Sequence, residues 1–177
     1  HLVSIEFDIA DSVAEEAVAL FQPDLIVAPY LRRAIPESIW KQHTCLIVHP
    51  GIVGDRGPSA LDWAIRNALG EWGVTVLQAE AEMDAGPVWA AATFPLRAAR
   101  KASIYRHEVT EAAVRAVTAA VNRQFEPNFK PERVPGEAHA TMRQSDRGID
   151  WQHDDSATVL AKLNAADGFP GVADVLF

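Results

Sequence analysis

The sequence predicts an α/β fold with a doubly wound, mostly parallel sheet of the Rossmann-like kind. Strand patterns alternate with helical patterns through the first half of the chain, which is the order that strand–helix–strand units produce. Residues 25–28 form a continuous apolar run, as is typical of a parallel strand covered on both faces. Residues 45–65 indicate a short buried strand, a glycine-rich turn and a helix, a unit that places functional groups at the carboxyl end of a sheet.

Periodicity and helix-start signals predict the amino-terminal elements. Residues 2–7 have a strand pattern. Ser12 and Glu15 have the spacing of a capping box, and the apolar face behind them predicts a helix that ends at Phe21. A short helix over residues 36–41 then leads into the strand that begins at residue 45.

That strand ends at His49, immediately before a proline–glycine break. Because side chains alternate between the faces of a strand, His49 shares one side with Ile47. The imidazole either bonds to loop backbone at the strand end or faces a crevice with an apolar wall. The next helix carries Asp62 in its first turn, where a carboxylate either suits the helix dipole or contacts a substrate.

The sequence beyond residue 72 predicts an antiparallel strand pair and a long helix. Residues 73–78 and 88–94 form the pair at the sheet edge, and Asp84 lies in the connection between them. Ser103 caps an amphipathic helix that ends near Arg123, and a further helix begins at Ser156. We therefore expect the whole chain to divide into three parts. These are a main domain (1–123), a linker or extended surface segment rich in proline and charge (124–140), and the start of a small carboxyl-terminal subdomain (141–177).

Composition narrows the function classes. The chain has 16 basic and 24 acidic residues and a formal net charge of -8, which argues against nucleic acid as a partner. Cys45 is the only cysteine, so a buried, inert thiol in a reducing compartment is expected. No apolar run or signal peptide suggests a membrane segment, and His153 with its two following aspartates is expected to be a solvated turn rather than a metal site. We therefore expect a soluble, cytoplasmic protein that binds no metal.

Two motifs together resemble the formyltransferase family that uses 10-formyltetrahydrofolate. The first is His-Pro-Gly at residues 49–51 followed by Arg-Gly-Pro at 56–58, and the second is Gly-Val-Thr-Val at 73–76 followed by Asp-Ala-Gly-Pro at 84–87. The resemblance implies that His49 and Asp84 are the catalytic pair. One position departs from the family, because Ile47 stands where the family usually carries an asparagine.

Three longer stretches resemble one branch of that family, which acts in hydrogenase maturation: HPGIVGDRGPSALDWAI, MRQSDRGIDW and LNAADGFPGV. This branch implies formyl transfer to coenzyme A, which gives formyl-CoA as a step toward the carbon monoxide ligand of NiFe hydrogenase. It also implies an enoyl-CoA hydratase-like domain in the same polypeptide. The family normally begins with one more strand and helix, so we expect further residues ahead of His1.

The resemblance also implies residue roles beyond the catalytic pair. Ile47 would line the passage of the pantetheine arm of coenzyme A. For the amide of the missing asparagine two possibilities stay open: another group, such as a backbone N–H near Gly51 or Gly54, replaces it, or the acceptor demands less help. The other expected substrate contacts are Gly51, Arg56, Gly57 and Asp62. The expected folate contacts are Tyr30, Leu31, Ile35, Ala81, Glu82 and Met83.

The chemistry expected of this pair is proton transfer at a carbonyl. A histidine can carry a proton near neutral pH and, when charged, can donate a hydrogen bond to the oxygen of the formyl group. A carboxylate bonded to that histidine, here Asp84, would fix its tautomer. Three alternatives stay open: transfer to an amine acceptor, hydrolysis of the formyl-folate, and a module that binds folate or coenzyme A without catalysis.

Overall fold

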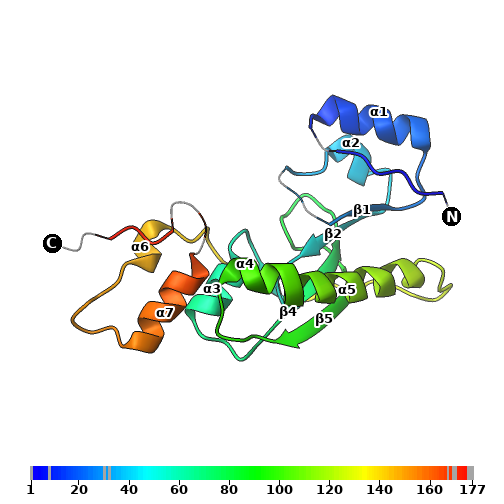
Figure 1. The fold of residues 1–177 in the computed structure, drawn as a ribbon. Coiled ribbons are helices and arrows are strands. Elements are labelled where there is room, and N and C mark those ends of the chain that lie inside the picture. Colours follow the sequence, from blue (N-terminus) through cyan, green and yellow to red (C-terminus); the bar gives the residue numbers. More distant parts are fainter. Residues whose placement is uncertain are drawn as a thin grey trace.

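The computed structural model describes residues 2–7, 9–29, 31, 33–166, 168 and 171–174. A four-stranded sheet in the order β1–β2–β4–β5 forms its centre (Figure 1). The strands are β1 (Ile26–Ala28), β2 (Cys45–His49), β4 (Glu71–Gln78) and β5 (Val88–Pro95). β1 and β2 are parallel, whereas β2–β4 and β4–β5 are antiparallel. The predicted α/β class and the antiparallel pair at the sheet edge are thus confirmed, and the described sheet is mixed.

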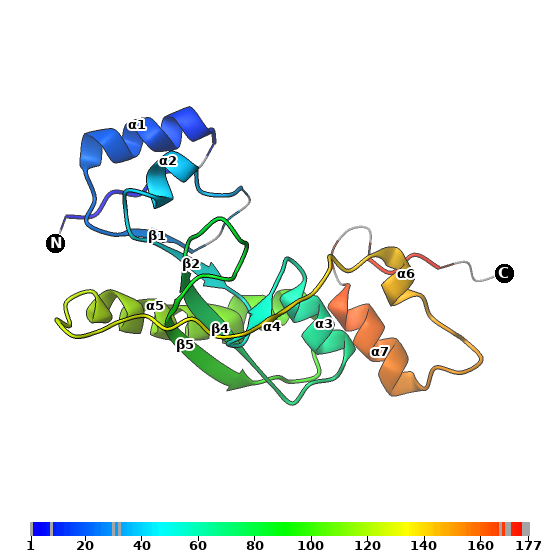
Figure 2. The same ribbon diagram turned by 180° about the vertical axis from the view of Figure 1, so that it is seen from behind.

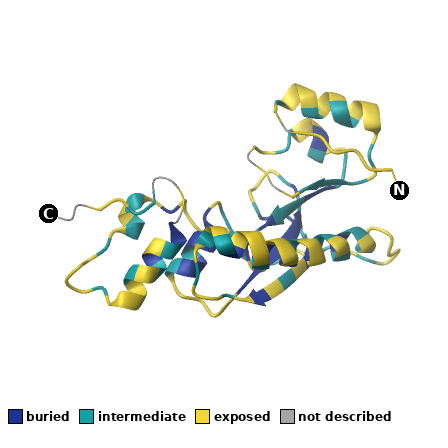
Figure 3. Cartoon of the chain, viewed as in Figure 1, coloured by how far each residue is buried: buried dark blue, intermediate teal, exposed yellow. Residues whose placement is uncertain are grey.

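One long helix covers a face of this sheet. A helical stretch begins with α4 (Lys101–Ile104), continues through the π-helical turn η1 (Tyr105–Val109) and ends with α5 (Thr110–Arg123). α5 packs Ala116 and Ala120 against Leu46 and Val76 of the sheet. Figure 3 shows the buried residues concentrated where this helix meets the strands.

The remaining helices lie at the two ends of the molecule (Figure 1). At the amino-terminal end, α1 (Asp11–Phe21) and α2 (Glu37–Trp40) pack near the β1 edge. At the other end lie α3 (Ala60–Arg66), α6 (Gln144–Arg147) and α7 (Ser156–Ala165). The apolar spacing of Ala60, Leu61, Ala64 and Ile65 predicts a buried stripe on α3, and the structure confirms that these four residues are buried. Ala165 of α7 joins the same core. None of the helices in the described ranges is long and apolar enough to cross a membrane.

The chain between α5 and α6 crosses the molecule in an extended conformation (Figure 2). Its strand β6 (Glu137–Ala138) pairs in parallel with β3 (Asp55–Arg56), in the turn after β2. Backbone N–H groups of Glu137 and His139 donate to the carbonyls of Gly54 and Arg56 at 2.9 and 2.8 Å. Of the two predicted possibilities, a linker or an extended surface segment, the structure has the second. This segment is hydrogen-bonded to the turn that carries Asp55.

The strand predicted for residues 2–7 is absent. The side chains of Leu2, Val3, Ile5 and Phe7 are 78–90% exposed, and no described strand pairs with this stretch. Alternating apolar residues favour a strand only where a neighbouring strand supplies hydrogen-bond partners. The alternation alone was therefore insufficient for the prediction.

Three predicted details of the helices are also wrong. α1 begins at Asp11 without a side-chain cap, and Glu15 accepts a hydrogen bond from Ser38 instead of closing a capping box. The long helix begins at Lys101, so Ser103 lies inside it and accepts a hydrogen bond from Arg97. Ala68, whose spacing from Ala64 predicts a place on the buried stripe of α3, is exposed because the helix ends at Arg66. A tertiary partner, an earlier helix start and an earlier helix end, respectively, outweighed the local signal.

Cys45 is expected to resist alkylation in the folded protein. Its side chain is fully buried, and this burial raises the pKa of the thiol to about 11. At pH 8 only about one thiol in a thousand would be ionised, and the thiolate is the reactive form. Peptide mass spectrometry after iodoacetamide treatment should find Cys45 unmodified in buffer and modified in urea. Equal modification in both conditions would contradict the buried position.

Candidate active site

His49 lies buried at the carboxyl end of β2, with its side chain only 4% exposed. Its backbone pairs with Thr75 of β4, and the strand stops because Pro50 has no N–H to continue the ladder. The predicted alternation is confirmed, since Cys45 and Ile47 pack in one apolar cluster while Leu46 and Val48 pack in another. The imidazole therefore projects from the side of the sheet that carries Ile47.

Asp84 reaches the same imidazole from the loop between β4 and β5. Its Oδ2 lies 3.4 Å from His49 Nδ1 and accepts a hydrogen bond of 3.0 Å from the backbone N–H of Gly57. Asp84 has a φ of 52°, in the left-handed region that is costly for residues with a side chain and that often occurs at functional sites. The structure thus brings together the two residues that the sequence motifs paired.

Asp55 is a second carboxylate beside His49, and the sequence analysis assigned it no role. Its Oδ2 lies 2.8 Å from His49 Nε2, and its side chain is 3% exposed. The turn after β2 folds back through Gly51 and brings Asp55 to the imidazole. The sequence signal for this contact was a carboxylate six residues after the histidine, in a glycine-rich turn. A carboxylate in such a turn more often only stabilises the turn itself.

Two of the five predicted substrate contacts lie directly at the His49–Asp84 pair, and the other three do not. Gly51 and Gly57 lie at the His49–Asp84 pair: a Cβ on Gly51 would approach His49 Nε2 to 2.3 Å, and Gly57 donates to Asp84. Ile47 packs partly buried on the apolar cluster of Cys45.

Arg56 and Asp62 are both held by other residues of the chain. Arg56 donates to Glu82 Oε1 at 3.0 Å and to the Val134 carbonyl at 3.3 Å. Asp62 Oδ1 accepts from Lys101 Nζ and from an Arg147 N–H, each at 2.9 Å, which ties α3 to α4 and α6. The ion pair between Arg147 and Asp62 is therefore mostly buried.

The predicted folate contacts lie on the β1–α2 connection and on the loop before Asp84. Ala81, Glu82 and Met83 are exposed, and Ile35 packs partly buried against the cluster of Ile39 and Cys45. Leu31 is 38% exposed, and Tyr30 lies outside the described residues. The described members of this set are therefore mainly exposed loop residues, together with one supported apolar side chain, that of Ile35.

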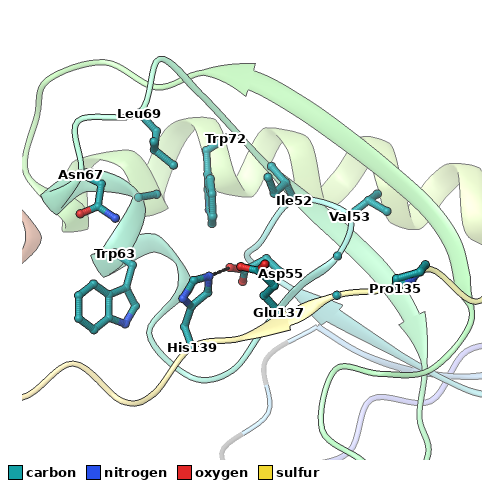
Figure 4. A pocket seen from close by; sticks show the side chains of 13 residues that line it. Ile52, Val53, Asp55, Trp63, Asn67, Leu69, Trp72, Pro135, Glu137 and His139 are labelled. Atoms are coloured by element: carbon teal, nitrogen blue, oxygen red, sulfur yellow. Dashed lines mark ion pairs between the residues drawn. The ribbon is translucent and has the colours of Figure 1, made fainter.

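A pocket of about 380 Å³ adjoins the site on the Asp55 side (Figure 4). Trp63, Trp72 and Leu69 supply its apolar wall, and His139 faces Asp55 across it. His139 Nε2 lies 3.4 Å from Asp55 Oδ1 and its side chain is 41% exposed. The pocket therefore reaches the buried His49 through Asp55. Among the described residues, no three His, Cys, Asp or Glu side chains are grouped as a metal site.

Comparison with known proteins agrees with the predicted branch. The hydrogenase maturation factor HoxX of Bradyrhizobium diazoefficiens is 52% identical to the chain. The match covers the whole chain and 32% of the length of HoxX. The crystal structure of HypX from Aquifex aeolicus in complex with tetrahydrofolic acid matches 97% of the chain and 31% of HypX, at 50% identity and a TM-score of 0.89. The chain thus spans about a third of the length of these relatives.

More distant relatives share the fold. A 4-N formyltransferase from Francisella tularensis matches 89% of the chain and 66% of its own length with a TM-score of 0.71, although the identity is 17%. The sequence profile named Formyl transferase matches residues 8–121, which is more than half of the chain and includes His49, Asp55 and Asp84. The chain belongs to the formyl transferase family.

Proposed function

We propose that this chain carries the formyl-transfer site of a hydrogenase maturation enzyme and that it takes the formyl group from 10-formyltetrahydrofolate. The main support is the buried His49 with Asp84 3.4 Å from its Nδ1, within a chain that is 50% identical to a folate-bound HypX. His49 would carry the proton that moves during transfer and would donate to the formyl oxygen when charged. Asp84 would orient the imidazole.

The local surface is compatible with a pterin. Pterin rings present several hydrogen-bonding groups on a flat apolar frame, so they suit exposed backbone beside an apolar side chain. The exposed backbone of residues 81–83 leads directly to Asp84, and Ile35 lies on the supported apolar cluster. We propose that these residues, with Leu31, hold the pterin so that the formyl group lies beside Asp84.

We propose coenzyme A as the acceptor because of the residue at position 47. The apolar side chain of Ile47 cannot donate to the formyl oxygen, and loss of one such donor costs about 2.7 to 4 kcal/mol of transition-state stabilisation. A thiol with a pKa of about 8.5 yields a strong nucleophile near neutral pH, so it demands less help than an amine. A backbone N–H in the turn at Gly51 or Gly54 would supply the remaining donor.

The proposed reaction balances without a further reactant. The sulfur of coenzyme A forms a bond to the formyl carbon, the bond from that carbon to the folate nitrogen breaks, and the thiol proton ends on that nitrogen. His49 is placed to carry this proton. Formyl-CoA would then split into carbon monoxide and coenzyme A in a second domain of the same polypeptide.

We infer that the chain is part of a larger polypeptide, since HoxX and HypX are about three times as long as the parts it matches. An enoyl-CoA hydratase-like domain is the proposed neighbour, because such a domain binds the thioester product of the first. The three-part division at residues 123 and 140 stays part of this proposal. The free thiol of Cys45 supports the cytoplasmic location that composition predicts.

Product analysis tests the acceptor. The full-length protein, mixed with formyl-labelled 10-formyltetrahydrofolate and coenzyme A, is expected to produce labelled formyl-CoA or, after the second step, labelled carbon monoxide. Without coenzyme A, any release of labelled formate from the same mixture should be much slower than the formation of the labelled product in its presence. An amino sugar in place of coenzyme A should stay unlabelled. Labelled formate would indicate a hydrolase, and a labelled amine would indicate an N-formyltransferase.

A further inference from the structure

Both ring nitrogens of His49 face a carboxylate. Nε2 lies 2.8 Å from Asp55 Oδ2, within the range of a charge-assisted hydrogen bond. Nδ1 lies 3.4 Å from Asp84 Oδ2, longer than a normal N–H···O bond. Because a neutral imidazole has only one N–H, it can donate to only one of these two carboxylates.

The two distances decide which carboxylate is the better acceptor. The 2.8 Å contact favours the tautomer and ring orientation in which Nε2 carries the proton and donates to Asp55. At 3.4 Å, Asp84 forms no short bond with Nδ1, so this second nitrogen is the one that stays available.

Asp55 is fixed more firmly than a turn residue usually is. Its backbone N–H donates to the Ile52 carbonyl at 3.0 Å, and its strand β3 pairs with β6 in the segment that returns past the site. Its Oδ1 is buried and accepts no hydrogen bond from the described residues, with His139 Nε2 at 3.4 Å on the pocket side (Figure 4). Oδ2, in contrast, is committed to His49.

We propose that Asp55 is a positioning residue for His49. Its carboxylate accepts a hydrogen bond from the Nε2–H group and holds the ring in one orientation. Nδ1, next to Asp84 and without a short bond, is then the nitrogen that exchanges a proton with the reactants. This role rests on the proposed formyl transfer, and it gives the returning segment of residues 132–140 a function, since that segment fixes Asp55.

Two substitutions in the full-length protein separate charge from orientation. Asp55→Asn keeps an oxygen that can accept from Nε2 but removes the charge, so kcat is expected to fall about tenfold or more while KM for the formyl-folate changes less than about threefold. Asp55→Ala also loses orientation and should lose about 10²-fold in kcat.

The chain offers a matched control in the exposed pair of His153 and Asp150. Its Nδ1–Oδ2 distance is also 2.8 Å, but the two side chains are 77% and 54% exposed. Asp150→Asn likewise removes the charge and keeps an accepting oxygen, and it should leave kcat unchanged. If the wild type is active and Asp55→Asn keeps its kcat, the positioning role is overturned. If the wild type forms no formylated product, the proposed function itself fails.

Discussion

Substitution of His49 by alanine in the full-length protein is expected to lower kcat for formyl transfer by about 10²–10⁴-fold, the range that a general acid–base residue contributes. The Kd for tetrahydrofolate should change by less than about threefold. The imidazole is 4% exposed and lies behind the surface loop that we propose for the pterin, so it contributes little to binding before reaction. Single-turnover kinetics and fluorescence titration with tetrahydrofolate would measure the two quantities.

Alanine also removes the imidazole that separates Asp55 from Asp84, which lowers stability by leaving two acidic groups without a partner between them. His49→Gln keeps an amide donor there and should be equally inactive, so it separates loss of chemistry from loss of fold. His153→Ala removes an exposed histidine that is bonded to an aspartate at 2.8 Å and should retain full activity. A His49 variant that binds folate and turns over at the wild-type rate would favour a binding module over an enzyme.

The proximity of His49 and Asp84 could be predicted from sequence because their two motifs together resemble the formyltransferase family, and each motif lies in an element with a clear local signal. Pro50 ends β2 directly after His49, and Asp84 lies in the connection of an antiparallel pair whose pattern is clear. Asp55 could not be predicted in the same way. Its contact with Nε2 depends on a turn conformation and on pairing between β3 and β6, which lie about 80 residues apart in sequence.

The same limit explains the errors in the fold. Residues 2–7 have the alternation of a strand, but pairing is a property of two segments and no described strand supplies the second. Residues 124–140 have the composition of a linker, yet backbone bonds to Gly54 and Arg56 hold part of them against the site. Composition reports the surface exposure of that segment correctly. It carries no information about which other backbone the segment bonds to.

Gly51→Ala is expected to disable the site with a single added methyl group. A Cβ at this position would lie 2.3 Å from His49 Nε2 and 2.5 Å from Asp55 Oδ2, far below van der Waals contact. The turn cannot move away easily, because Thr75 Oγ1 on β4 donates to the Gly51 carbonyl at 2.8 Å. The methyl group should therefore separate His49 from Asp55, with a loss of about 10²-fold in kcat and about 1–3 kcal/mol in the free energy of unfolding.

Gly70→Ala is the matched control for this substitution. Gly70 lies just before β4 and is exposed, and a methyl group added there would meet no atom of a non-adjacent described residue within 4 Å. It should leave kcat and the denaturation midpoint near their wild-type values, so that the loss at Gly51 is attributable to position rather than to the change from glycine to alanine. Steady-state kinetics and urea denaturation of both variants measure this difference. Wild-type kcat in Gly51→Ala would mean that activity does not require the close approach of His49 to Asp55, because the methyl group and that contact cannot occupy the same space.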